Sequence, residues 1–481
     1  MLGYAFRMIY TKERRDRAFF NFLRGVFLAK GIIHLFKIKD RKLALDVESD
    51  TLHLVDDIVW DYLSKREEGF CHDDTFGYLK KTYNNQDIKE AISEIFALED
   101  KGQLWSEAFH RKNPNEPVVK ALCLNVAHSC NLSCRYCFAG EGCYGGEQEL
   151  MSVNTGKAAV DFLLYHAKGR KKAELDFFGG EPLLNMKVVE EVTSYVRKRE
   201  KETGISFNLT ITTNGLLLND AIIRYLREEN FSVVLSLDGR KEIHNKMRTY
   251  KNGKGSYEDV VAKLNEFVSQ WGDSYYIRGT FTRFNRDFCK DVKHLHKLGY
   301  KNLSLEPAVS LPEEPWALSE SDIPLLCEEY ESLAEHYLES REKGEPYTFF
   351  HFEVDIYKGP CIYKRLSGCG AGEEYLAVTP TGDIFPCHQL IGEEKLRMGN
   401  VNIQGDFRKL PEKLFPPAGP LENECPSCWA RYHCGGGCRA ASGLYNKDFN
   451  KPYKLECSMQ KKRLECALYI QAELSQGSFG S

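Results

Sequence analysis

The chain has 481 residues, of which 42% are hydrophobic and 28% are charged. This composition excludes a disordered or fibrous chain and allows about three globular domains. Lys and Arg number 65 against 69 Asp and Glu, so the net charge of −4 gives no general attraction to nucleic acid or to an anionic membrane. The most apolar early stretch, Phe19 to Ala29, is too short and too polar for a membrane span or a secretory signal. We therefore expect a cytoplasmic protein.

The first hundred residues divide into three parts. Residues 1–31 contain no clear start or stop signal, and we treat them as an N-terminal extension without an assigned structure. Between residues 32 and 108, three stretches of alternating apolar and polar residues predict short strands, and three helical patterns follow them. This order is typical of a winged-helix-like module. The polar residues 109–118, which include two prolines, predict a linker.

Strands and helices then alternate regularly from residue 119 to residue 310. Six strand patterns, each followed by a helical pattern, predict an α/β fold built as a partial (β/α)6 barrel. Residues 311–354 predict a helical bridge, and residues 355–466 are rich in loops, short strands and cysteines. That region has too few regular apolar residues to fold without staples, which metal would supply. We expect residues 467–481 to form a tail.

Seventeen cysteines without a secretion signal argue for metal ligation or thiol chemistry in a reducing compartment rather than for disulfides. Cys130, Cys134 and Cys137 form a C-x3-C-x2-C motif directly after the first barrel strand, where barrel enzymes place their chemistry. Three thiolates can hold three irons of a 4Fe–4S cube and leave the fourth iron open to a small molecule. Cys143 is available as a fourth ligand, so a closed structural zinc or iron site is the alternative.

The sequence CNLSCRYCF resembles the signature of the radical S-adenosylmethionine (SAM) superfamily. The resemblance extends from Lys120 to Ser310, because the polar motifs GGEP, TTN and SLDG follow in order at the ends of successive strands. In that superfamily these positions hold S-adenosylmethionine, and the glycines allow close approach of the backbone. The cofactor-binding residues that the resemblance implies are Tyr136, Gly179, Gly180, Glu181, Pro182, Thr213, Asn214, Ser236, Asp238 and Arg248.

The C-terminal cysteines have a seven-Cys spacing that resembles the SPASM domain of peptide-modifying radical enzymes. In that family the domain carries two auxiliary 4Fe–4S clusters, so the resemblance implies three 4Fe–4S clusters in all. The first auxiliary cluster would take Cys369, Cys387 and Cys438, and the second Cys425, Cys428, Cys434 and Cys457. Cys361 lies where a fourth ligand of the first cluster would come from, which leaves open whether that cluster has an open iron. A pair of zinc knuckles is the alternative, because Cys-x2-Cys suits zinc equally.

A winged-helix module with an exposed strand edge can bind a peptide as a further strand. Its combination with a radical barrel and a SPASM domain resembles the SCIFF peptide maturases, on the sequences LCLNVAHSCNLSCRYCF, GPCIYKRLSGCG and FPCHQL. The resemblance implies an oxidoreductase that uses a 5′-deoxyadenosyl radical to join a Cys sulfur to a Cα carbon. The implied partners are a Cys-rich precursor peptide and a low-potential electron donor of the flavodoxin or ferredoxin type, with no nucleic acid and no membrane. His388 and Asp383 are candidates to accept the thiol or Cα proton.

Two other functions remain open at this point. A sulfatase-maturing enzyme, which forms formylglycine, is the nearest alternative, but that family places an Asp where His388 follows Cys387 in this chain. A non-catalytic iron–sulfur regulator that binds DNA through the winged helix belongs to a different class. The module lacks the concentrated basic face that such a regulator needs. The remaining thiols are predicted to be packing or inert residues, namely Cys71, Cys123, Cys289, Cys327 and Cys466.

Overall fold

The computed structural model describes residues 6–8, 31–107, 118–167, 169–272, 274–354, 369–407 and 425–477. The predicted linker, most of the N-terminal extension and Cys361 therefore lie outside the described residues. Among the described helices, none combines the length and apolar character that a membrane crossing requires.

The N-terminal module contains the three strands and three helices that the sequence predicts. They are β2 (Ile33–Ile38), β3 (Arg41–Asp46), β4 (Thr51–Val55), α1 (Asp57–Glu67), α2 (His72–Leu79) and α3 (Asn85–Asp100). The strands pair as an antiparallel meander, and their period-2 alternation buries both faces of the sheet. Ala44 and Val55 pack with the module's own helices. Leu43, Leu45 and Leu52 belong instead to the large core that the module shares with the rest of the molecule.

The edge of β4 carries an additional strand. Residues Phe6–Met8 form β1, which pairs antiparallel with β4, so that Phe6 lies opposite Val55 and Met8 opposite His53. The sheet order is β1-β4-β3-β2. The sequence predicts no structure for residues 1–31, and within them the structure describes this one strand, Phe6–Met8. Three residues are too few for an alternation pattern to be recognised.

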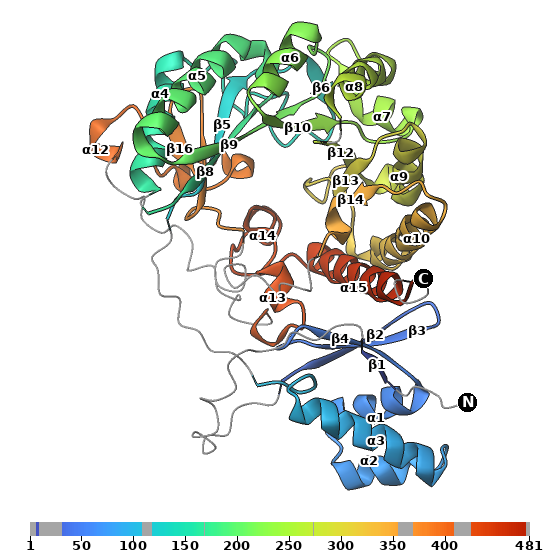
Figure 1. Cartoon of the computed structure of the whole chain (residues 1–481). Coiled ribbons are helices and arrows are strands. Elements are labelled where there is room, and N and C mark those ends of the chain that lie inside the picture. Colours follow the sequence, from blue (N-terminus) through green and yellow to red (C-terminus); the bar gives the residue numbers. More distant parts are fainter. Residues whose placement is uncertain are drawn as a thin grey trace.

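The predicted six-stranded parallel barrel is present. Its strands are β5 (Ala121–His128), β8 (Lys172–Gly179), β9 (Ser206–Thr213), β10 (Phe231–Ser236), β12 (Tyr275–Phe281) and β13 (Asn302–Pro307). Figure 1 shows them as an arc with helices on its outer side, namely α4 (Val153–His166), α5 (Met186–Thr203), α6 (Asp220–Glu228), α7 (Lys241–Met247), α8 (Tyr257–Trp271) and α9 (Phe288–Lys297). In β9 the buried Phe207, Leu209 and Ile211 belong to the core, and the intervening Thr210 and Thr212 are only half-buried. The inner face of the barrel is therefore polar enough to form a site.

The cysteine-rich C-terminal region adds to the same sheet. Strand β15 (Tyr375–Val378) pairs in parallel with β5, and β16 (Asp383–Phe385) and β17 (Gly399–Asn400) follow antiparallel. At the other edge β14 (Thr348–Phe349) pairs with β13. The remaining short elements are β6 (Leu132–Cys134), β7 (Glu149–Leu150), β11 (Arg248–Tyr250), α12 (Gln404–Phe407), α13 (Arg431–Cys434) and α14 (Arg439–Asn446).

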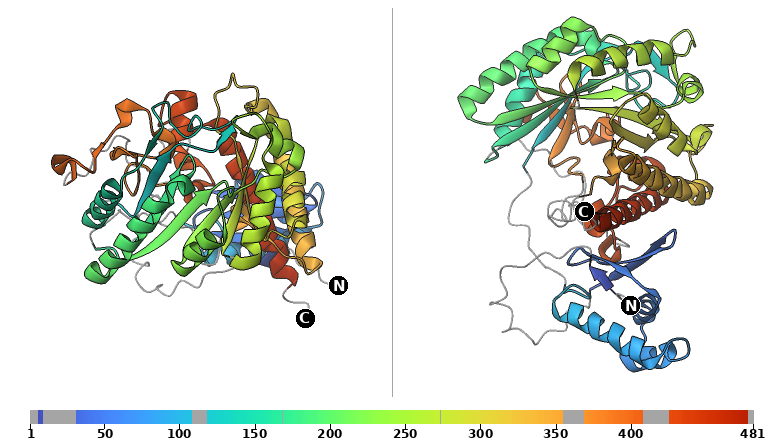
Figure 2. Two further views of the ribbon diagram at one scale, coloured as in Figure 1. Left: turned by 90° about the horizontal axis from the view of Figure 1, so that it is seen from above. Right: turned by 45° about the vertical axis from the view of Figure 1, so that its right-hand side comes forward.

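The last helix corrects the predicted tail. Helix α15 spans Lys454–Gly477 and packs against α10 (Ile323–Glu342), which the sequence predicts as a bridge helix. Leu468 and Ile470 of α15 are buried in the core, although the sequence predicts residues 467–481 to be a tail. In Figures 1 and 2, α15 lies between the barrel and the N-terminal module.

The N-terminal module contacts one short C-terminal segment, residues 429–433, as well as helix α15, where His34 lies 3.0 Å from Glu465 and Arg41 lies 2.8 Å from Glu473. The Trp429 and His34 rings stack with their centroids 3.8 Å apart. Tyr432 donates a hydrogen bond of 2.6 Å to Glu48, which also pairs with Arg431, and His433 lies 2.8 Å from Asp50. Glu48 and Asp50 are 4% and 2% exposed, so these polar contacts are shielded from water.

Candidate active site

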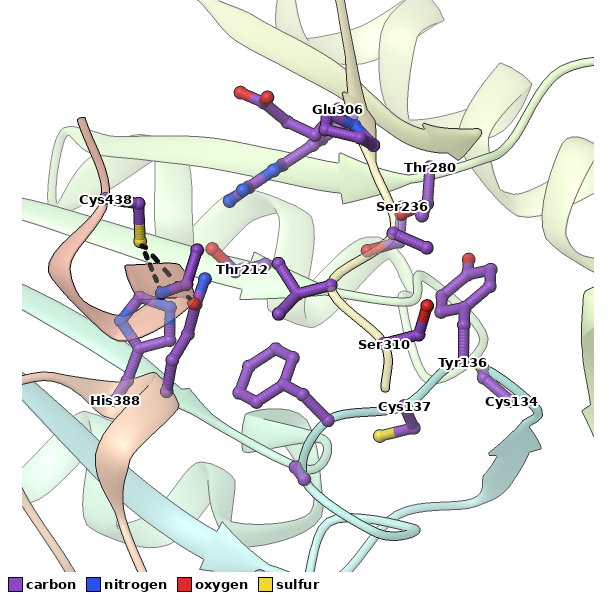
Figure 3. A pocket seen from close by; sticks show the side chains of 18 of the residues that line it. Cys134, Tyr136, Cys137, Thr212, Ser236, Thr280, Glu306, Ser310, His388 and Cys438 are labelled. Atoms are coloured by element: carbon purple, nitrogen blue, oxygen red, sulfur yellow. Dashed lines mark hydrogen bonds between the residues drawn. The ribbon is translucent and has the colours of Figure 1, made fainter. Parts of the chain in front are cut away.

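A cavity of about 400 Å³ lies on the inner side of the barrel, at the carboxyl ends of its strands. Its volume is in the range of small-molecule sites. It collects twelve of the residues that the sequence analysis selected, namely Cys130, Cys134, Tyr136, Cys137, Gly179, Gly180, Thr213, Asn214, Ser236, Arg248, His388 and Cys438. Figure 3 shows the labelled ones projecting from several elements toward a shared space.

The C-x3-C-x2-C loop brings three thiols to this cavity. The backbone N–H of Leu132 points to Cys130 Sγ at 3.4 Å, and the Asn214 side-chain amide lies 3.8 Å from the same sulfur. Burial raises the pKa of Cys130 to about 11 and that of Cys134 to about 12. Cys143 does not line the cavity, and its thiol instead donates to the Gly140 carbonyl at 2.9 Å. Three thiols of this loop therefore line the cavity, and the Cys143 thiol does not.

The two glycines after β8 give the cavity a backbone floor. Gly179 has φ +129°, and a Cβ there would meet the Ala127 carbonyl oxygen at 2.4 Å. A Cβ on Gly180 would meet the Ser129 carbonyl oxygen at 2.3 Å. Because no side chain fits at either position, a ligand can approach the peptide groups directly.

Glu181 and Pro182 follow these glycines and are not among the residues that line the cavity, so their contact with the cofactor stays a prediction. The buried Glu181 carboxylate accepts hydrogen bonds from Thr213 Oγ1 at 2.7 Å and from the Asn214 N–H at 2.8 Å. Burial raises the pKa of Glu181 to about 7 despite these bonds. A strand-end motif does not reveal which way its side chain points. Glu181 acts by positioning Thr213 and Asn214, which do line the cavity.

Asp238 is likewise not among the residues that line the cavity. It is buried and accepts hydrogen bonds from Tyr136 Oη at 2.5 Å, Arg248 Nε at 3.0 Å and the Thr280 N–H at 3.0 Å. The predicted contact of Asp238 with the cofactor stays a prediction. Asp238 anchors Tyr136 and Arg248, both of which line the cavity.

The first C-terminal cysteine set borders the same cavity. Cys438 lines it, and burial together with the nearby Cys387 and Cys369 thiols raises the pKa of Cys438 well above its usual value. Burial raises the pKa of Cys387 to about 12, and Cys369 contributes to this shift. The three described thiols of this set are thus close enough to influence one another.

The second set forms a separate site. Cys425, Cys428, Cys434 and Cys457 surround a smaller cavity. Among the described residues, no three Cys, His, Asp or Glu side chains converge closely enough to hold a single metal ion. A group of thiols around a space, rather than around a point, is a donor set that fits iron–sulfur ligation.

The structure separates the two predicted proton acceptors. His388 lines the cavity, its Nδ1 lies 2.8 Å from Tyr375 Oη, and burial lowers the pKa of His388 to about 3. Asp383 does not line the cavity and is bonded to Arg397 at 2.6 Å and to Asn400 at 2.9 Å. Through these bonds Asp383 holds the β16–β17 turn, and its role as a proton acceptor stays a prediction.

Several cavity residues were missed by the sequence analysis. They are Arg278, Thr280, Glu306, Glu456 and Arg463. Glu306 lies 3.2 Å from Arg463 and 3.1 Å from His351, and although burial alone would raise the pKa of Glu306, its interactions with these two residues hold it well below its usual value. Arg278 could have been selected from the sequence, because a charged residue in the otherwise apolar pattern of β12 indicates the inner face of a barrel.

Residues 124–314 match the Radical SAM superfamily model. The chain therefore carries a radical SAM domain, and the protein is a radical SAM enzyme. It is similar to the radical SAM cyclopropyl synthase TigE of Paramaledivibacter caminithermalis, with 23% identity over 423 residues that cover 78% of this chain and 84% of TigE. It is also similar to the cysteine-type anaerobic sulfatase-maturating enzyme of Clostridium novyi, with 29% identity over 345 residues that cover 68% of this chain and 88% of that enzyme.

Solved structures show the same fold. Native anSMEcpe with bound AdoMet and Kp18Cys peptide has a TM-score of 0.61 and 21% identity, covering 75% of this chain and 100% of that one. SuiB of Streptococcus suis bound to S-adenosylmethionine has a TM-score of 0.50 and 13% identity, covering 89% of this chain and 99% of that one. Both comparisons place the radical SAM α/β fold, with its mostly parallel sheet, in this chain.

Proposed function

We propose that the protein is a peptide maturase that joins a Cys sulfur to a Cα carbon of a Cys-rich precursor peptide. The observation that carries this proposal is the composition of the cavity. It is lined by the three thiols of the C-x3-C-x2-C loop and also by Cys438 of the first C-terminal set. In Figure 3, Cys137 and Cys438 belong to different walls. A peptide in the cavity would therefore lie between two sulfur-rich sites.

The proposed cofactors are S-adenosylmethionine and three 4Fe–4S clusters. When bound at the three-cysteine site and reduced by one electron, S-adenosylmethionine supplies a 5′-deoxyadenosyl radical that can remove a hydrogen atom from carbon. The glycine backbone of residues 179–180, together with Thr213, Asn214 and Arg248, provides the polar groups that would hold it. Phe138 and Phe178 lie 5.7 and 5.0 Å from the His388 ring and form an apolar part of the wall that limits access of water.

The proton-accepting role of His388 stays a prediction, which its place on the cavity wall supports. The flavodoxin- or ferredoxin-type electron donor also stays a prediction. The structure of anSMEcpe with a bound Cys peptide supports a peptide as the substrate class, because this chain shares that fold.

The test of the reaction is a mass measurement. With reductant, S-adenosylmethionine and a synthetic Cys-containing peptide, we expect 5′-deoxyadenosine and a peptide lighter by two hydrogens. One C–H and one S–H are replaced by a C–S bond, so a thiol reagent should label one fewer Cys. Tandem mass spectrometry should place the bond between sulfur and Cα. A product with a formyl group in place of the thiol, and without a sulfur-to-carbon bond, would overturn this proposal.

That second outcome would establish the sulfatase-maturing alternative, which the similarity to the Clostridium novyi enzyme favours. We keep it second because His388 follows Cys387 where the sulfatase-maturing pattern has an Asp. The nearest Asp along the chain, Asp383, is bonded to Arg397 outside the cavity. The candidate site therefore lacks the carboxylate that this alternative requires at that position.

We further propose that the N-terminal module binds the precursor by strand addition. The pairing of β1 with β4 supports this, because it means that the β4 edge accepts an antiparallel strand. A precursor that added to β4 would take the place of β1.

Removal of residues 1–108 is expected to weaken binding of the precursor by about tenfold or more, because both the strand edge and its pockets are lost. Uncoupled cleavage of S-adenosylmethionine should persist. The matched control removes only residues 1–30, which frees the β4 edge and should leave binding unchanged or tighter. Binding is measured by fluorescence anisotropy of a labelled precursor, with iron content as the check on folding. Unchanged affinity after the larger deletion would exclude the module from recognition.

A further inference from the structure

One arginine on the cavity wall has no hydrogen-bonded or ion-paired partner among the residues that the structure describes. In β12, Tyr275, Ile277, Gly279 and Phe281 are buried, whereas Arg278 is exposed and lines the cavity. In the part of the chain that the structure describes, no hydrogen bond or ion pair involves its guanidinium. The other two arginines on this wall are committed, because Arg248 is bonded to Asp238 and Arg463 to Glu306 and Tyr330.

The strands on both sides leave room around this guanidinium. The sheet register places Ser236 of β10 and Ser304 of β13 directly beside Arg278. Both side chains are small, so neither covers the arginine head group. The space in front of Arg278 is therefore open to a ligand in the cavity.

Neither acidic residue at this end of the cavity forms an ion pair with Arg278 in the part of the chain that the structure describes. Glu306 lies on the same wall but is shared between Arg463 at 3.2 Å and His351 at 3.1 Å. Glu456, the other acidic residue at this end of the cavity, accepts the Cys438 N–H at 3.1 Å. Arg278 also contributes to lowering the pKa of Glu306 and of His388, so its charge acts on both the barrel wall and the C-terminal wall.

An unpaired guanidinium in a confined cavity favours an anionic ligand. Its planar set of N–H donors matches a carboxylate in a bidentate arrangement, and such charge-assisted hydrogen bonds are the strong ones. A peptide can present a carboxylate from an Asp or Glu side chain or from its C-terminus.

We propose that Arg278 binds a carboxylate of the peptide substrate and thereby selects which residue stands at the reacting position. The inference rests on the proposed function to the extent that a peptide enters the cavity. It does not depend on whether the product is a thioether. Arg278 is thus assigned as a specificity-determining residue of the same site.

The experiment is a double-mutant cycle between the enzyme and the substrate. Four synthetic peptides share one Cys and differ in two features, an Asp or an Asn beside that Cys and a free or amidated C-terminus. The readout is kcat/KM for peptide-dependent formation of 5′-deoxyadenosine, supported by the Kd of each peptide. We expect one of the two carboxylates to raise kcat/KM by about tenfold or more, which corresponds to a charged hydrogen-bonded pair. The pair of peptides whose kcat/KM values differ shows whether the carboxylate comes from the Asp side chain or from the C-terminus.

In R278Q this discrimination should fall to about one, because the neutral amide cannot form the ion pair. R278K should retain part of it, since Lys keeps the charge but not the planar fork. The control is R224Q, which removes an exposed arginine from the outer helix α6 and should leave the ratio unchanged.

The proposal would be overturned if the unmodified enzyme gave equal kcat/KM values for acidic and neutral peptides, or if R278Q kept the difference. An equal loss of kcat/KM for acidic and neutral peptides in R278Q would also contradict it. Weaker binding of S-adenosylmethionine to R278Q in the absence of peptide would also overturn it, because Arg278 would then hold the cofactor. A formylated product would remove the thioether proposal while the kcat/KM ratios still decide the role of Arg278.

Discussion

Replacing Cys130, Cys134 and Cys137 together with Ala is expected to abolish cleavage of S-adenosylmethionine while about two thirds of the iron remains bound. All three thiols line the cavity that also contains the glycine backbone floor. The Cys425 set surrounds a separate cavity, so its iron should not depend on the C-x3-C-x2-C loop. The unmodified protein, reconstituted anaerobically, should hold about twelve irons per chain as three four-iron cubes.

Iron analysis and chromatographic detection of 5′-deoxyadenosine measure the two effects. The control is Cys143→Ala, which should keep both, because Cys143 bonds to the Gly140 carbonyl and does not line the cavity. Loss of all iron in the triple variant would mean that the sites are not independent. Stoichiometric zinc with little iron in the unmodified protein would overturn the cluster assignment itself.

Replacing Cys425, Cys428, Cys434 and Cys457 with Ala should release about a third of the iron and loosen the contacts of the N-terminal module with residues 429–433, while its ion pairs with α15 remain. The contacts of Trp429, Tyr432 and His433 with the module all lie between two of these cysteines in the sequence. Without bound iron, the ends of the segment 429–433 would no longer be fixed. Its side chains would then contact the module less often, and buried partners such as Glu48 would lose hydrogen bonds. We expect crosslinking of the precursor to fail while uncoupled cleavage of S-adenosylmethionine continues.

Hydrogen exchange is the measurement for this second prediction, and the β3–β4 turn with Glu48 and Asp50 should exchange at least about tenfold faster in the variant. Cys71→Ser is the matched control, because Cys71 caps α2 within the module and Ser keeps the cap. Equal exchange rates in the variant and the unmodified protein would show that cluster ligation and module docking are independent.

The barrel could be predicted from sequence because its strands alternate in a period of two and end in short polar motifs. The same patterns could not give the direction of a side chain at a strand end. Glu181 and Asp238 lie at the predicted edge of the sheet, and each is bonded to residues that line the cavity. Arg278 was not predicted as a site residue, because it lies within a strand and belongs to none of the short motifs.

The spacing of Cys130, Cys134 and Cys137 predicts that their thiols lie together, because closely spaced residues share one loop, and all three line the cavity. The cysteine spacings could not show that α15 continues through residue 477, since that depends on its packing against α10. Asp383 was chosen for its nearness in sequence to Cys387. The sequence does not show that the Asp383 carboxylate is bonded to Arg397 and Asn400, because these bonds depend on the three-dimensional turn.

The parallel pairing of β15 with β5 has a consequence for the movement of electrons. β5 leads directly into the loop of Cys130, and the short segment after β15 and β16 leads to Cys387. Both groups of thiols are thus attached to neighbouring strands of one hydrogen-bonded sheet. Their separation is fixed by backbone geometry and not by how the N-terminal module docks. An electron passing between them would cross the same distance whether or not the module holds a peptide, so recognition and electron transfer can vary independently in this molecule.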